Sequence, residues 1–142
     1  MSRILAYLKE WEYFRRLGLE TIEAINTSNT WDYRLNQNEF SVRDTFNHTI
    51  QSIFEDAGNW FLNDSTRFQR SEDPTNDFLI SVDRMIAAIK NLTDTDLEKS
   101  FTFPWGKETT IEGAILQNLF HAIAHFGQLR ERTGVAKRTQ TG

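Results

Sequence analysis

The sequence contains no cysteine, which excludes a disulfide framework, a thiolate zinc site, an iron–sulfur cluster and a cysteine nucleophile. Only two prolines and seven glycines are present, so helices are favoured over a turn-rich all-β fold. No apolar run approaches the ~20 residues that a membrane-spanning helix needs. The start of the chain reaches charged and polar residues within its first turns and is unlike a secretory signal peptide.

Charge of neither sign dominates the chain. Sixteen Lys and Arg residues against 20 Asp and Glu residues give a net charge of −4 and a pI of about 5.4. This balance excludes a broad nucleic-acid-binding surface. With 39% hydrophobic residues, the 142-residue chain can bury one core but is too short for two. We therefore expect a single soluble cytoplasmic domain over residues 1–142, with neither nucleic acid nor a membrane as a partner.

Apolar residues recur at three- and four-residue steps in four segments, which is the spacing of one face of a helix. These segments cover residues 4–25, 41–64, 74–92 and 109–132. Residues 26–30 are expected to break the first segment from the second. Residues 101–108 alternate in polarity and then turn, so they predict a short extended piece or hairpin.

Several residues mark where the predicted helices begin and end. Ser41 and Asp44 resemble a capping box, although Asp stands where Glu or Gln is usual. Pro74 suits the first turn of the third helix, where its missing N–H costs nothing. Gly134 is expected to end the fourth helix, and the polar tail from Ala136 is expected to fray.

The four segments predict an all-α four-helix bundle in up-and-down order. A long link joins the first two helices, and the extended or hairpin connector precedes the fourth. The fourth segment is apolar almost all round, which is typical of a buried helix, so we expect it to be the most buried of the four.

Two of the three histidines, His121 and His125, are four residues apart on the fourth helix. This spacing places both rings on one helix face, where they can reach a single metal ion. Asn118 and Gln128 lie beside them at the edge of the apolar stripe. The spacing alone leaves a second interpretation open, in which both histidines belong to the core or its rim and bind backbone or water.

His48, the third histidine, lies on the second helix, nearly opposite the apolar stripe of that helix. It shares its polar face with Asp44, Gln51 and Glu55. This position by itself favours exposure to solvent. If that face borders a cleft, Asp44 or Glu55 could act as an oxygen ligand or as a partner of one.

Common catalytic signatures are absent from the sequence. The segment between His121 and His125 lacks the glutamate of the zinc-protease helix, and no Glu-x-x-His of a di-iron bundle occurs. The glycine-rich nucleotide-binding motifs and the serine-hydrolase motif G-x-S-x-G are also missing. No residue stands out as an obligatory general acid or base.

Two segments of the chain resemble the DinB/YfiT-like superfamily, a group of four-helix proteins regarded as metal-dependent. They are residues 41–48, SVRDTFNH, and residues 103–129, which run from FPWGKETT to HAIAHFGQL. The likeness covers nearly the whole chain. Phe126 stands where many relatives carry an arginine.

The resemblance implies that His48, His121 and His125 hold one divalent metal ion such as nickel, zinc or iron. It also implies open coordination positions for water or a small-molecule substrate, and a homodimeric assembly. Some relatives are transferases that act with a low-molecular-weight thiol, so that activity is the leading functional hypothesis.

Other functions remain open at this point. A metal-dependent hydrolase is one alternative, because a bound ion also activates water. A non-catalytic, stress-related module that binds a metal or ligand is another. The third is a plain helical interaction domain with incidental histidines.

Overall fold

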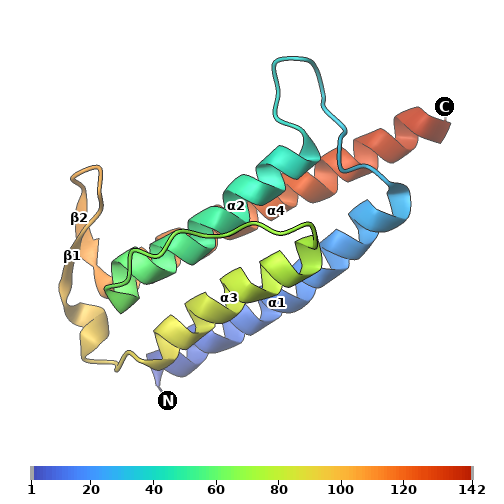
Figure 1. Ribbon diagram of the computed structural model, residues 1–142. Coiled ribbons are helices and arrows are strands. Elements are labelled where there is room, and N and C mark those ends of the chain that lie inside the picture. Colours follow the sequence, from blue (N-terminus) through green and yellow to red (C-terminus); the bar gives the residue numbers. More distant parts are fainter. Residues whose placement is uncertain (1, 142) are drawn as a thin grey trace.

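The structure, a computed structural model, describes the backbone of residues 2–141 and the side chains of residues 2–139. It consists mainly of four long helices (Figure 1), which confirms the predicted all-α bundle. These helices are α1 (Arg3–Ser28), α2 (Val42–Ala57), α3 (Pro74–Lys90) and α4 (Ile111–Thr141). A π-helical turn, η1 (Gly58–Leu62), extends α2, and a 3-10 turn, η2 (Asp96–Glu98), follows α3.

The connector before α4 is a small antiparallel hairpin, as the sequence predicts. Strand β1 (Ser100–Thr102) pairs with β2 (Glu108–Thr110), with Phe101 opposite Thr109. Gly106 has a φ of 93°, a left-handed conformation that favours glycine at this turn. The hairpin lies at the end of the bundle where α4 begins (Figure 1).

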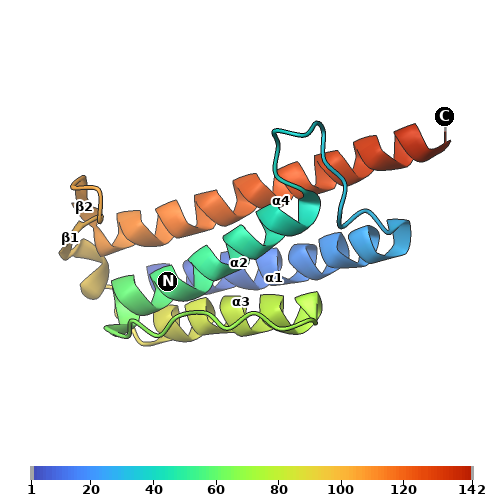
Figure 2. The same cartoon turned by 45° about the horizontal axis from the view of Figure 1, so that its top comes forward.

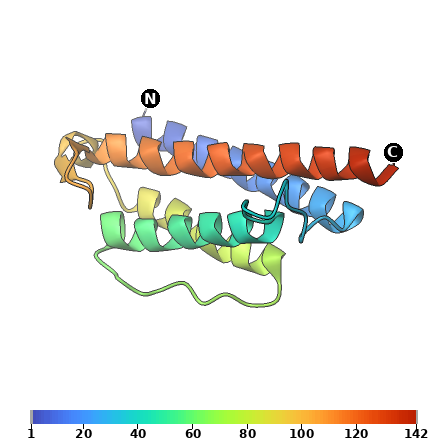
Figure 3. The same ribbon diagram turned by 90° about the horizontal axis from the view of Figure 1, so that it is seen from above.

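The direction of the helices differs from the expected up-and-down order. Helices α1 and α4 run one way, whereas α2 and α3 both run the other way (Figure 2). The link over residues 63–73 therefore runs back along the bundle before α3 begins (Figure 3). Eleven extended residues span up to ~36 Å, which exceeds the ~26 Å length of a 17-residue helix. The long link predicted between the first two helices is present as well, over residues 29–41.

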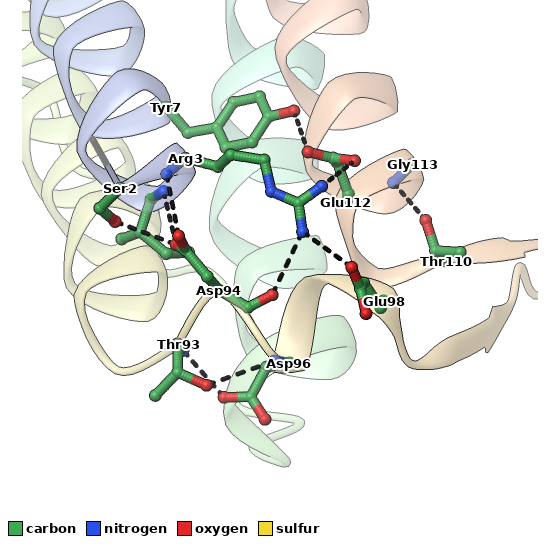
Figure 4. A network of polar contacts seen from close by, with 11 residues as sticks. Ser2, Arg3, Tyr7, Thr93, Asp94, Asp96, Glu98, Thr110, Glu112 and Gly113 are labelled. Carbon is green, nitrogen blue, oxygen red and sulfur yellow. Dashed lines mark hydrogen bonds and ion pairs between the residues drawn. The ribbon is translucent and has the colours of Figure 1, made fainter.

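Helix α1 begins without help from its own N-cap residue. Ser2 makes no side-chain capping bond within the helix, and the Asp94 carboxylate accepts hydrogen bonds from the backbone N–H groups of Arg3 and Ile4 instead. Figure 4 shows Asp94 reaching this helix end from the link that follows α3. At the other end α1 runs three residues beyond Ile25 and stops at Asn29, which has a φ of 53°.

Helix α4 continues through Gly134 to the end of the described chain, so the expected stop at Gly134 and the frayed tail are both wrong. Thr133 and Ala136, on either side of the glycine, are buried. The hydroxyl of Thr133 accepts a 3.4 Å hydrogen bond from that of Thr30, just beyond α1. This packing outweighs the ~1 kcal/mol by which glycine disfavours a helix interior.

The expectation that α4 is the most buried helix is also wrong. Three large apolar side chains on its outer face are 46–68% exposed, namely Leu116, Phe120 and Ile123. Helix α4 packs mainly against α1 and α2, and these three side chains lie on the face that neither helix covers. By contrast, α3 carries a higher proportion of buried positions.

Aromatic side chains from all four helices meet in the core. The rings of Phe14, Phe78 and Phe126 pack with centroids 5.0–5.8 Å apart, and Phe46 joins Phe126 from α2. A Cβ on Gly18 would collide with the ring of Phe78, so this glycine permits the close approach of α1 and α3. The core thereby sets how far α4 lies from α2, which positions the histidines.

None of the described helices combines the length and apolarity that crossing a bilayer requires.

Candidate metal centre

His121 and His125 lie one above the other on the edge of α4 that faces α2. Their Nε2 atoms are 3.0 Å apart, and their rings are nearly perpendicular, at 87° with centroids 4.4 Å apart. The four-residue spacing on a regular helix produces this arrangement. Both side chains are partly buried, so their inner edges face α2 rather than bulk solvent.

His48 reaches the same place from α2. Its ring centroid lies 5.8 Å from that of His121 and 5.7 Å from that of His125. One nitrogen of each of the three rings lies within 4.8 Å of the others. His48 is exposed, as its position on the polar face predicts, yet that face borders α4. The structure therefore brings together all three histidines that the sequence singles out.

The geometry fits a single divalent ion. Two nitrogens bound to one ion at ~2.0–2.1 Å, with an angle of about 90–109° between them, lie about 2.9–3.4 Å apart. The 3.0 Å between the Nε2 atoms of His121 and His125 falls in this range. The His48 nitrogen lies within 4.8 Å of the other two, so a small shift of its side chain would bring it to bonding distance of the same ion.

Neighbouring groups keep the rings in the form that a metal requires. The Gln128 side-chain oxygen lies 2.9 Å from Nδ1 of His125, so it can accept the Nδ1 proton and leave Nε2 free to bind an ion. Burial, followed by the nearby His125 and His48, lowers the pKa of His121, which favours its neutral form. Neutral imidazole is the ligand form.

The acidic residues that shared the predicted face of His48 are engaged elsewhere. Asp44 completes the predicted capping box with Ser41 and pairs with Arg34. The Glu55 carboxylate accepts hydrogen bonds from Gln51 and from the backbone of the link after η1. Neither carboxylate belongs to the histidine cluster, which is the one group with metal-ligand geometry among the described residues.

Asn118, one turn before His121, is buried, and its side-chain oxygen lacks a hydrogen-bond partner among the described residues. Its position on α4 thus agrees with the sequence, but it forms no hydrogen bond with a histidine within the described residues.

A cavity of about 220 Å³ opens beside the histidines. His48, Thr45, His125 and Gln128 line it from the two helices, and Glu39, Phe40 and Arg132 complete it. Sequence reasoning missed these last three residues. The one available signal was that Arg132 follows His125 by seven residues, which places it two turns further along nearly the same face.

The class of protein that this fold and site define is a four-helix bundle with a three-histidine cluster between its second and fourth helices. The chain has a DinB-like fold: it is similar to the crystal structure of a DinB-like protein, YjoA, from Bacillus subtilis. The TM-score is 0.73 at 19% sequence identity, and the match covers 96% of this chain and 92% of YjoA. No protein-family model and no curated protein matches the sequence.

Proposed function

We propose that the protein binds one divalent metal ion through His48, His121 and His125. The observation that carries the proposal is the convergence of three imidazoles, with one nitrogen of each within 4.8 Å of the others. Histidines that are simply solvated on the surface would have no reason to come this close to one another from two different helices. The resemblance of residues 41–48 and 103–129 to the DinB/YfiT-like superfamily supports the same ligand set.

The decisive measurement is the metal content of protein purified without a histidine tag. Wild-type protein loaded with nickel, zinc or ferrous iron and then desalted should retain about one ion per chain. His48→Ala should retain far less after the same treatment. Gln51→Ala is the matched control on the same helix, because Gln51 bonds to Glu55 away from the cluster. Equally tight binding by His48→Ala would contradict the three-histidine site.

We further propose that the ion serves a transferase that acts with a low-molecular-weight thiol. When bound, the ion would lower the pKa of a coordinated thiol or water. The adjacent cavity of about 220 Å³ offers space for a small-molecule substrate. The cytoplasm is the proposed location, because small thiols are kept reduced there.

Hydrolysis is the alternative chemistry, and a non-catalytic, stress-related binding module is the alternative without chemistry. Thiol-conjugation and ester-hydrolysis screens on metal-loaded protein separate the three. Activity in the first screen that disappears with the ion supports the transferase. Activity in the second alone supports a hydrolase, and metal binding without either activity supports a binding module.

A homodimer is also part of the proposal, through the outer face of α4. Leu116, Phe120 and Ile123 are exposed there, and beside them Tyr13 and Leu17 of α1 line an open apolar cavity of about 470 Å³. Such a patch is the kind of surface that a second copy covers. Sedimentation should give a dimer that Phe120→Glu converts to a monomer. A wild-type monomer at high micromolar concentration would exclude it.

A further inference from the structure

Arg132 is the least satisfied charged side chain at the candidate centre. Its side chain is only 16% exposed, yet its nearest anionic partner is a Glu39 carboxylate oxygen 3.8 Å away. That separation is too long for a hydrogen bond, and Arg132 makes no hydrogen bond through its side chain within the described residues. A guanidinium has five N–H donors, and removing them from water without replacement is costly.

Three other arginines that pack against the helices form hydrogen bonds. Arg15 and Arg43 are more exposed than Arg132, but the Nε of each donates to an aspartate at 2.9–3.1 Å. Arg84 is similarly buried, and it donates to the backbone of Asp64 and stacks on a phenylalanine ring. The Nε of Arg84 is also buried without a partner, but Arg84 keeps its other contacts. Of these four arginines, Arg132 is the one that forms no hydrogen bond within the described residues, and it lines the cavity beside the histidines.

Further donors face the same cavity. Thr45 lines it, and the Thr45 hydroxyl has no hydrogen-bond partner in the described part of the chain. Gln128 uses its oxygen on His125, which leaves its amide N–H₂ group available. Donors from α2 and α4 thus converge on one space, and Glu39 is the carboxylate that lines it.

Glu39 is placed so that its carboxylate can leave. Its backbone carbonyl is held by Arg34, which donates a 2.8 Å hydrogen bond to it. Its side chain is about half exposed and touches Arg132 only at 3.8 Å. Movement of the carboxylate into solvent would break no hydrogen bond and would leave the backbone of the link in place.

We propose that Arg132 binds the carboxylate of a small-molecule ligand, whose other end reaches the three histidines, and that this carboxylate displaces Glu39. The part that involves the histidines rests on the proposed function. A guanidinium and a carboxylate match in two parallel hydrogen bonds. Arg132 lies ~10.5 Å along α4 from His125, a span that the arginine side chain and a short ligand bridge together.

The chemistry of the cavity favours a carboxylate over a phosphate. One arginine, already beside one carboxylate, supplies too little positive charge for a group that carries nearly two negative charges. The volume of about 220 Å³ lies below the ~300–1,000 Å³ of sites for drug-sized molecules, so the ligand is small.

The test uses thiols that differ in their tails. Protein loaded with Co²⁺ is titrated with mercaptoacetate, 3-mercaptopropionate and 4-mercaptobutyrate, and with neutral 1-thioglycerol, while thiolate-to-cobalt absorption reports binding. At least one of the acids should bind about tenfold or more tightly than 1-thioglycerol. Arg132→Gln should abolish that preference without weakening 1-thioglycerol, and Glu39→Gln should strengthen binding of the same acid severalfold.

A second arm separates this proposal from the metal site. Metal-free protein is titrated with propionate, and NMR should show a shift of the Arg132 Nε–H signal that is larger in Glu39→Gln. If Co²⁺ does not bind but this shift occurs, the metal proposal fails and the carboxylate site stands. If Arg132→Gln does not fold, Arg132→Lys should fold and lose most of the preference. Equal affinity for acids and 1-thioglycerol in wild type, or no shift with propionate, would overturn the assignment.

Discussion

Two polar clusters of the molecule differ in how well their members satisfy one another. At the corner where α1 begins, Arg3 contacts the carboxylates of Glu98 and Glu112 and the backbone carbonyl of Asp94 (Figure 4). Tyr7 donates a 2.7 Å hydrogen bond to Glu112 in the same network. Between α2 and α4, in contrast, the histidines face one another, and the Arg132 side chain forms no hydrogen bond with any described residue.

This difference suggests that the corner at α1 stabilises the fold, whereas the cluster between α2 and α4 is suited to bind a ligand. The corner joins residues 90–109 positions apart, and its donors and acceptors bond mainly to each other. The histidine cluster leaves nitrogen lone pairs and N–H donors directed at shared space. Polar groups that are left without partners destabilise a fold unless something binds them. Changes at the corner should therefore affect folding, and changes at the histidine cluster should affect binding.

The largest effect is expected for His121→Ala. This substitution removes one of three proposed ligands, and the loss in metal affinity should exceed the ~10–100-fold that loss of an outer partner costs. The melting temperature of the metal-free protein should remain near that of wild type, because the one side-chain hydrogen bond of His121 within the described residues joins it to His125. Isothermal titration with Zn²⁺ and a thermal melt without metal check the two halves. If His121→Ala binds zinc as tightly as wild type, the histidine cluster is not a metal site and its contrast with the corner at α1 fails.

A smaller loss of metal affinity is expected for Gln128→Ala. The Gln128 oxygen is bonded to Nδ1 of His125, and without it the ring is free to turn or change tautomer. We expect about a tenfold weaker zinc affinity. Gln128→Glu is the matched variant, since its carboxylate still accepts from Nδ1, and it should restore most of the affinity. A loss of equal size in both variants would show that the hydrogen bond is not the cause.

The fold was predictable from sequence where local chemistry decided it. The capping box at Ser41, the start of α3 at Pro74 and the hairpin over residues 101–108 all depend on neighbours close in the chain. The passage of α4 through Gly134 depends on packing against the end of α1, more than 100 positions away. The parallel course of α2 and α3 depends on a polar link whose path carries no periodic signal.

The candidate site divides in the same way. His121 and His125 were predictable as a pair because four residues make one helical turn. His48 needed the relative rotation of α2 and α4, which the sequence suggests only through family resemblance. Glu39 and Arg132 were missed because a lone charge in a link and a charge near a helix end are ordinarily solvated.

Asp94→Ala is expected to lower the stability of the fold without changing metal binding. Asp94 accepts hydrogen bonds from the Ser2 hydroxyl and the backbone N–H groups of Arg3 and Ile4, and its loss should lower the melting temperature by several degrees at pH 7. Zinc affinity should not change. Ser2→Ala removes only one of these bonds and should cost less.

Acid should erase the effect of Asp94→Ala. The hydrogen bond from the Ile4 backbone, followed by that from Ser2, lowers the pKa of Asp94 below its ordinary 3.8. The stabilisation is therefore present above pH 3.8 and is lost as the pH falls through the lower pKa of the folded state. Thermal melts of both proteins across this range check the prediction. A difference that persists unchanged in acid would mean that the carboxylate charge is not what stabilises α1.

The smallest effect is expected at Asp56. Its side chain has no hydrogen-bond partner among the described residues, and it lies outside the cavity beside the histidines. Burial, and then the nearby Glu55, raises the pKa of Asp56 from 3.8 to about 6. The folded state therefore binds this proton more tightly than the unfolded state does. Its contribution to stability is fully present below pH 3.8 and is lost as the pH rises through about 6.

Asp56→Asn should consequently stabilise the protein at pH 7.5, by about 1 kcal/mol once solvent screening of a half-buried carboxyl is allowed for. At pH 4 the substitution should change the stability little. Urea unfolding of both proteins at the two pH values measures this difference. If Asp56→Asn is less stable than wild type at pH 7.5, the Asp56 carboxylate stabilises the fold. That result would contradict the view that a charge without a partner outside the cavity destabilises the protein.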